Sequence, residues 1–135
     1  MSDSRGAYAA VIFDMDGVLA DSEPIYYEAV NVCLAPLGKV VTPELQRRLM
    51  GHGVADTWQI LSQELALEGP LDSLVNAYDQ ELCRLLRGVT EPLPGVRTLL
   101  ETLASRGVPY GLASSSWPNW IEALLGGIGL QDAFS

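Results

Sequence analysis

Basic residues are scarce in this 135-residue sequence, which holds 8 Lys and Arg against 17 Asp and Glu and has a net charge of −9. Proteins that bind nucleic acid or anionic membrane surfaces need basic patches, so we expect neither kind of partner. A small phosphorylated metabolite is compatible with this charge, because a metal ion and backbone N–H groups can hold phosphate locally.

Cysteine is also scarce, and long apolar runs are absent. Cys33 and Cys83 are the two cysteines, and each lies in an apolar helical pattern, which favours free buried thiols over a disulfide or a metal pair. No apolar run is long enough to cross a bilayer, and residues 1–13 do not resemble a secretory signal. We therefore expect a soluble cytoplasmic protein, and the 48% apolar content is sufficient for a core.

The sequence does contain two aspartates directly after an apolar strand. Residues 9–13 predict a buried parallel strand, and Asp14, Asp16 and Gly17 follow it. Residues i and i+2 of an extended chain lie on one side, so the two carboxylates converge and repel unless a cation or a shared proton intervenes. Hard oxygen ligands favour Mg²⁺. A polar turn with glycine at a positive φ, and no metal, is the structural alternative.

Spacing excludes two other ligand motifs. In a calcium-binding EF-hand loop that began at Asp14, the acidic, glycine and glutamate positions would hold Val18, Leu19 and Ile25. Residues 51–53, Gly-His-Gly, lack the third glycine and the preceding strand of a dinucleotide-binding fingerprint.

Residues 21–88 predict a bundle of helices. The first helix starts near Pro24 and stops at Gly38, and the others cover residues 42–49, 54–65 and 71–88.

The chain changes character after this helical region. Residues 90–95 carry two prolines and a glycine and predict a loop that leads back into a second layer. A helix at residues 96–106 and a strand at residues 109–113 follow. Ser116 is the expected N-cap of a further helix, with Pro118 in its first turn.

Two segments carry a resemblance to a known family. Residues 13–23 resemble the first motif of the haloacid dehalogenase-like (HAD) superfamily of phosphohydrolases almost letter for letter, and residues 93–116 resemble the helix, strand and second motif that follow the cap. The resemblance implies an α/β fold of the β-phosphoglucomutase/phosphatase-like subfamily. Its Rossmann-like core, here with an incomplete parallel sheet, would hold residues 1–20 and 89–135, and residues 21–88 would form an inserted α-helical cap domain.

The resemblance also implies roles for four residues. Asp14 would attack the phosphoryl group and form an aspartyl-phosphate, and Asp16 would protonate the leaving oxygen and then activate water. Mg²⁺ would bind the Asp14 carboxylate and the backbone carbonyl of Asp16. Ser114 would hydrogen-bond the phosphoryl group, aided by N–H groups around Ser115 and the next helix start. Without the resemblance, these serines read as a polar turn and a helix cap.

Three comparisons within the family favour hydrolysis of a phosphate ester. The dehalogenase branch lacks a counterpart of Asp16, because expelling halide needs no proton. The phosphonate-cleaving branch needs a cap lysine, and Lys39, the only lysine, does not fit that branch. β-Phosphoglucomutase carries a histidine where this chain has Tyr26 and an arginine where it has Val54, so a sugar-phosphate mutase is the weaker reading.

Two family motifs are missing. The family places a lysine or arginine and then an acidic pair beyond the second motif, but no Lys or Arg follows Ser116, and Glu122 and Asp132 do not fit the pair. We therefore expect an N-terminal portion of a phosphatase that is weakly active or inactive alone. A non-catalytic remnant that associates through an open edge of the first strand is the alternative in another function class.

The substrate is expected to be a small phosphomonoester such as a sugar phosphate, but its identity does not follow from the sequence. The residues expected to face the cleft are Glu23, Tyr26, His52 and Asn119. His52, the only histidine, is equally compatible with an exposed loop position.

Overall fold

The computed structural model describes residues 8–134. Residues 1–7, which belong to the predicted N-terminal core segment, and residue 135 lie outside the described part. Along the chain the elements are β1 (Val11–Phe13), α1 (Glu23–Leu34), the 3₁₀ helix η1 (Ala35–Leu37), α2 (Pro43–Leu49), α3 (Val54–Glu64), α4 (Leu71–Arg87), α5 (Val96–Ser105), β2 (Tyr110–Leu112) and α6 (Pro118–Ile128). This arrangement confirms the predicted α/β class with a small parallel sheet.

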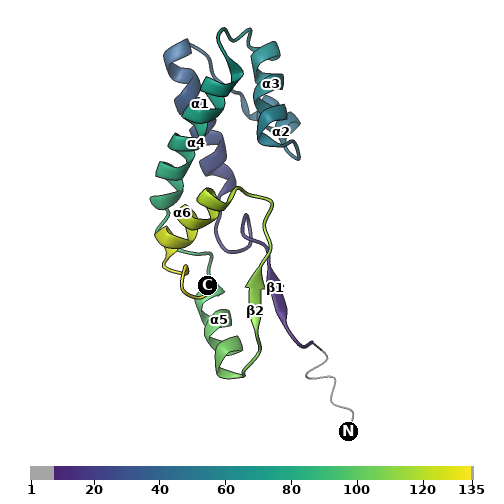
Figure 1. The fold of residues 1–135 in the computed structure, drawn as a ribbon, viewed down its shortest axis with the longest axis vertical. Helices are drawn as coiled ribbons and strands as arrows, with labels where there is room; N and C mark the ends of the chain where they lie inside the picture. Colours follow the sequence, from purple (N-terminus) through teal and green to yellow (C-terminus); the bar gives the residue numbers. More distant parts are fainter. Residues whose placement is uncertain (1–7, 135) are drawn as a thin grey trace. The chain divides into compact units, whose positions relative to one another are not determined.

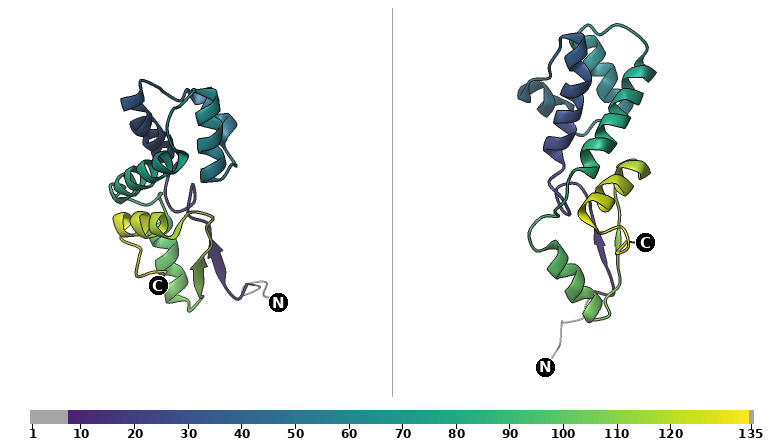
Figure 2. Two further views of the ribbon diagram at one scale, coloured as in Figure 1. Left: turned by 45° about the horizontal axis from the view of Figure 1, so that its top comes forward. Right: turned by 90° about the vertical axis from the view of Figure 1, so that its left-hand side faces the viewer.

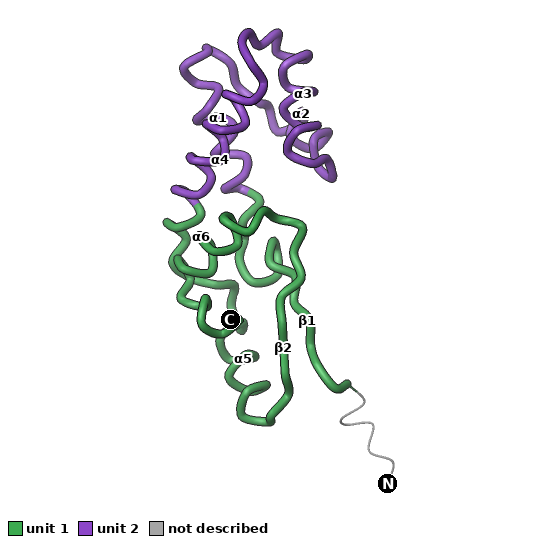
Figure 3. Tube along the Cα trace, viewed as in Figure 1, with its two compact units in different colours: residues 1–23, 86–135 green, residues 24–85 purple. Residues whose placement is uncertain are grey.

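The contact pattern divides the chain into two units, shown in green and purple in Figure 3. Unit 1 contains Met1–Glu23 and Leu86–Ser135, and unit 2 contains Pro24–Leu85. Unit 1 is therefore built from two separate stretches of the chain, and unit 2 is one continuous stretch between them. The predicted core and cap segments have their boundaries at residues 20 and 88.

The sheet of unit 1 consists of β1 and β2, which run parallel. Their register pairs Val11 with Tyr110 and Phe13 with Leu112. A backbone hydrogen bond lies at each end of this pairing: Val11 N donates to Pro109 O at 3.0 Å, and Ala113 N donates to Phe13 O at 2.8 Å. The carboxyl ends of both strands therefore meet at one edge. Both predicted strands are present, but each is three residues long.

Two helices cover one side of this sheet. α5 and α6 lie on the same side of β1 and β2 (Figure 1, Figure 2). Because side chains alternate along a strand, Phe13 and Ile12 face opposite sides, and they are 8% and 67% exposed. The apolar side chains of unit 1 that are buried are those of Phe13, Met15, Leu19, Ala20, Leu86, Val96, Leu100, Trp120, Ala123, Leu124, Leu125, Ile128 and Leu130. The second edge of β1 has no strand partner among residues 8–134.

Unit 2 is all helical. Figure 2 shows α1 and α4 side by side, with α2 and α3 completing the unit. Trp58 of α3 contacts Tyr78 of α4 edge to face, with their ring centroids 5.6 Å apart. The Tyr27 hydroxyl donates to Val41 O at 2.6 Å and so ties α1 to the segment before α2. These contacts hold together helices that the sequence pattern predicts one by one.

The helix ends follow local chemistry. Thr42 caps α2 by accepting a bond from Leu45 N at 3.2 Å, and Gly38 stops the first helical segment with φ +69°, as predicted. The predicted single helix up to Gly38 is wrong in one respect, because α1 ends at Leu34 and a 3₁₀ turn follows. Pro36 has no N–H to donate within an α-helix, so the tighter turn is favoured.

Both cysteines are free thiols in the described structure, with Cys83 buried and Cys33 half-buried. Burial raises the pKa of the Cys33 thiol, and the negative charge of Glu81 raises it further. Glu81 stays charged at neutral pH, because its hydrogen bond with Arg84 lowers the pKa of the Glu81 carboxyl. Cys33 is therefore mainly protonated at neutral pH.

We expect Cys33 to react with iodoacetamide more slowly than free cysteine, whose thiol has a pKa of about 8.5, because only the thiolate is nucleophilic. The rate should rise with pH to a midpoint above that of free cysteine, and Glu81→Gln should shift the midpoint down. Alkylation kinetics in a Cys83→Ser background measure this, with Glu68→Gln as a control. An unchanged midpoint in Glu81→Gln would contradict the assignment.

Candidate functional site

Asp14 and Asp16 follow β1 in a compact loop. Met15 and Leu19 are fully buried and anchor this loop, while Asp14 is exposed. Backbone bonds close the loop, since Leu19 N donates to Met15 O at 2.9 Å and Gly17 N donates to Ala20 O at 2.8 Å. Gly17 has φ +75° and nothing lies within 4 Å of an added Cβ, so backbone conformation rather than space requires glycine here.

The side chains of the two aspartates are held differently. Asp14 Oδ1 accepts a bond from Met15 N at 2.7 Å, a local contact between neighbours in the chain. Asp16 accepts from two hydroxyls: Ser22 Oγ donates to Oδ1 at 2.5 Å, and Ser116 Oγ donates to Oδ2 at 2.8 Å. Asp16 therefore joins its own loop to the loop that follows β2.

The predicted phosphate-binding serines lie after β2. Ser114 is half-buried and its Oγ accepts a bond from Ser116 N at 3.1 Å, and Ser115 is exposed. The predicted N-cap role of Ser116 is wrong, because Trp117 occupies the N-cap position of α6 and no side chain caps the helix. The Ser116 hydroxyl instead donates a hydrogen bond to the Asp16 carboxylate. Because this acceptor is charged, the bond is stronger than a hydrogen bond between neutral groups at a helix cap.

The structure thus brings Asp16 and the 114–116 loop together at the carboxyl edge of the sheet. In open α/β sheets this edge is where ligands bind. Glu23 lies exposed at the start of α1, and Asn119 lies exposed near the start of α6. Tyr26 in α1 and His52 in the loop between α2 and α3 belong to unit 2. A role for these four residues in substrate binding stays a prediction.

Sequence reasoning gave no role to Ser22 and the wrong role to Ser116. Ser22 is fully buried, although it lies between the exposed residues Asp21 and Glu23. A polar run of this kind gives no sign of burial. The contact between Ser116 and Asp16 joins distant parts of the chain, so only the pairing of β1 with β2 reveals it.

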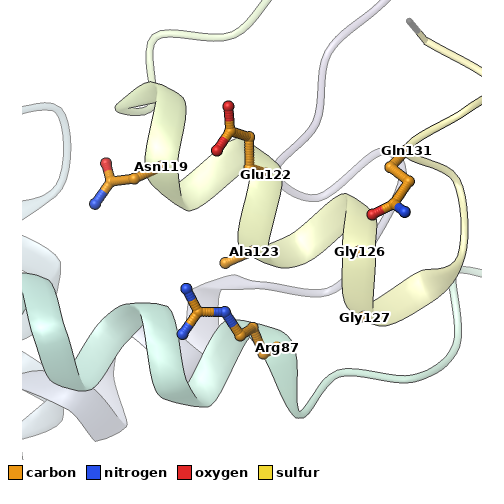
Figure 4. A pocket seen from close by; sticks show the side chains of 7 residues that line it. All are labelled: Arg87, Asn119, Glu122, Ala123, Gly126, Gly127 and Gln131. Carbon is orange, nitrogen blue, oxygen red and sulfur yellow. The ribbon is translucent and has the colours of Figure 1, made fainter.

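A polar hollow of about 380 Å³ lies beside α6 and the end of α4. Figure 4 shows Arg87 reaching from α4 toward α6, with Asn119 near one end of the hollow and Gln131 near the other. Arg87 is the one cation among its lining residues, which also include Glu122. Here α6 approaches the segment after α4 closely, since a Cβ on Gly127 would lie 2.4 Å from Val89 O.

Two kinds of feature are absent from the described residues. Within residues 8–134, no cluster of three or more His, Cys, Asp or Glu side chains is placed to hold a metal ion. No helix in the same part of the chain combines the length and apolarity needed to cross a bilayer.

Several known proteins are similar to this chain in sequence or in structure. A phosphorylated carbohydrates phosphatase of Thermotoga maritima is 37% identical over 107 residues, which cover 79% of this chain and 50% of that protein. The crystal structure of a β-phosphoglucomutase candidate from Thermotoga maritima matches with a TM-score of 0.80 at 34% identity, over 95% of this chain and 59% of that one. A HAD family hydrolase from Deinococcus radiodurans with bound phosphate and sodium matches with a TM-score of 0.68 at 26% identity, over 95% of this chain and 56% of that one.

The chain spans about half the length of the curated relatives it matches. The model of one family, described as haloacid dehalogenase-like hydrolase, matches residues 11–135. That range includes both strands, the aspartate loop and the serine loop, and the chain belongs to the haloacid dehalogenase-like hydrolase family.

Proposed function

We propose that the protein is a Mg²⁺-dependent phosphatase that hydrolyses a small phosphomonoester, such as a sugar phosphate, through an aspartyl-phosphate intermediate. The observation that carries the proposal is the meeting of the Asp14–Asp16 loop with the serine loop at the carboxyl edge of the sheet, through the bond from Ser116 to Asp16. The phosphatase named among the relatives and the phosphate bound by the Deinococcus hydrolase support the substrate class.

Asp14 is the nucleophile in this proposal. Its carboxylate is exposed at the end of β1, and the Met15 N–H orients it. A new bond would form between a carboxylate oxygen and phosphorus as the ester P–O bond breaks. Ser114 would hydrogen-bond the transferring phosphoryl group.

Asp16 is the general acid and then the general base. It would give its proton to the leaving oxygen in the first step and take a proton from water in the second. A proton donor at this place favours oxygen leaving groups, which agrees with a phosphate ester as substrate.

The oxygen donors at the site suit Mg²⁺ in kind. The Asp14 carboxylate and the Asp16 backbone carbonyl would hold it, and in proteins Mg²⁺ is usually bound by one or two carboxylates together with waters and substrate phosphate. When bound, the ion would screen the repulsion between the Asp14 carboxylate and the phosphate.

We propose further that unit 2 is the cap that selects the leaving group, and that Glu23, Tyr26, His52 and Asn119 contribute to this selection. By itself the chain is proposed to be weakly active or inactive, because no Lys or Arg follows Ser116 to neutralise the phosphate. The proposed location is the cytoplasm.

Two other functions each have one observation in their favour. The structural match to a β-phosphoglucomutase candidate favours a mutase. Tyr26 and Val54 argue against it, because the resemblance implies a histidine and an arginine at these positions of a β-phosphoglucomutase. The second edge of β1, which has no strand partner among the described residues, favours self-association through the open sheet edge.

We expect release of inorganic phosphate from glucose 6-phosphate to need Mg²⁺ and to stop with EDTA. Fusing the chain to the C-terminal half of the Thermotoga phosphatase, which we propose supplies the remaining charges, should raise turnover by about 10²–10³-fold, the usual effect of restoring an electrostatic group. We call this fusion the extended chain.

Phosphate release is measured for both forms, with circular dichroism to verify folding. A folded extended chain without Mg²⁺-dependent release would contradict the proposed function. Equal turnover by the chain alone would defeat the proposal of weak activity. Conversion of glucose 1-phosphate to the 6-phosphate would favour the mutase.

A further inference from the structure

Both carboxylate oxygens of Asp16 are engaged by hydroxyls from different parts of unit 1. Ser22 Oγ lies 2.5 Å from Oδ1, and Ser116 Oγ lies 2.8 Å from Oδ2. A carboxylate that is bonded on both oxygens cannot rotate about its last torsion without losing a bond. The two contacts therefore fix the plane of the Asp16 carboxylate.

Ser22 forms the buried side of this arrangement. It is fully buried, and its backbone N–H donates to Ala20 O at 3.1 Å. A buried hydroxyl without a hydrogen-bond partner is destabilising, so the bond to Asp16 also offsets the cost of burying Ser22.

Ser116 bonds the other carboxylate oxygen of Asp16 and does not cap α6. A serine side chain at the N-cap stabilises a helix, yet no side chain caps α6, which starts two residues after Ser116. The Ser116 backbone is fixed separately, because its N–H donates to Ser114 Oγ at 3.1 Å. Ser116 thus links Asp16 to the serine proposed to bind the phosphoryl group.

Hydroxyls are suited to this place because each can donate or accept a hydrogen bond, whereas an ammonium or guanidinium group can only donate. We propose that Ser116 is a positioning residue that holds Asp16 in the orientation for proton transfer at the leaving oxygen. This inference rests on the proposed function for the role of Asp16, but the contact itself can be tested without turnover.

The first test is spectroscopic and uses the whole chain labelled with ¹³C-aspartate. The carboxyl resonance of Asp16 is identified by its loss in Asp16→Asn. We expect Ser116→Ala to shift this resonance, Ser116→Thr to restore it, and the control Ser105→Ala, which removes a hydroxyl from the surface of α5, to leave it in place. An Asp16 resonance that does not respond to Ser116→Ala would overturn the inference, whether or not the protein is a phosphatase.

The second test separates positioning from a purely structural role. Protonation by a general acid speeds the departure of a poor leaving group such as phenolate strongly, and that of p-nitrophenolate only slightly. In the extended chain we expect Ser116→Ala to slow phenyl phosphate hydrolysis about tenfold more than p-nitrophenyl phosphate hydrolysis, and Ser116→Thr to recover most of the difference. Equal losses on both substrates would overturn the positioning role.

Discussion

We expect Asp14→Asn to lower Mg²⁺-dependent phosphate release by at least about 10³-fold in the extended chain, because it removes the proposed nucleophile. The amide cannot form the aspartyl-phosphate, so no alternative route replaces the step. The fold should be retained, because Asp14 is exposed and an asparagine Oδ1 can still accept the bond from Met15 N. The midpoint of thermal unfolding should therefore stay within about 2 °C.

Asp21→Asn is the matched control for this variant. Asp21 is another exposed aspartate a few residues further along the chain, so its replacement makes the same change in charge and volume. We expect turnover within a few-fold of the unchanged protein. Comparable losses in both variants would mean that net charge, rather than the nucleophile, explains the effect, and full activity in Asp14→Asn would reject Asp14 as the nucleophile.

We expect Gly127→Ala to destabilise unit 1 by about 1–3 kcal/mol, the usual cost of overpacking. The added Cβ would lie 2.4 Å from Val89 O, 2.8 Å from Arg87 O and 3.1 Å from Leu86 O. These are backbone carbonyls at the end of α4 and just beyond it, so they cannot rotate away as the end of a side chain could. Relief requires α6 to move away from that segment.

Gly126→Ala isolates this effect, because both substitutions add one methyl to the same helix. Its Cβ would lie 3.2 Å from Gln131 Oε1, the end of a flexible side chain. Since alanine favours a helix over glycine, we expect this variant to be stabilised by up to about 1 kcal/mol. Opposite signs in the two variants are the expected result, and equal stabilities would show that α6 is free to shift.

Urea unfolding followed by tryptophan emission measures this difference. Trp117 and Trp120 are in unit 1, so in a Trp58→Phe background the emission reports on that unit. A Gly127→Ala transition that coincides with that of Gly126→Ala would contradict the close approach of α6 to the segment after α4.

The helices were predictable because their signals are local. The Thr42-Pro43-Glu44 start of α2 and the glycine stop at Gly38 depend on residues within a few positions of the helix end, and both are confirmed. The 3₁₀ turn at η1 does not follow from the apolar pattern, which continues through Leu37, although its cause is also local, namely the missing N–H of Pro36.

The strands and the contacts of the site depend on distant residues. Residues 9–13 have strand character, but only Val11–Phe13 belong to the strand, because its length follows from its pairing with β2. The sequence predicts Asp14 and Asp16 as a pair, yet it does not predict that Ser22 and Ser116 bond Asp16. Ser116 was assigned to the adjacent helix because its carboxylate partner is distant in the sequence.

The division of unit 1 between two stretches of the chain has a consequence for folding. Phe13 pairs with Leu112, so the sheet cannot form until residue 112 has been synthesised, and bringing the strands together costs loop-closure entropy. Unit 2 is continuous, with contacts closer in sequence, so we expect its helices to form first and to shorten the effective distance between the two strands. The bond between Asp16 and Ser116 spans the same closure, so we expect the proposed catalytic arrangement to form with the sheet and after unit 2.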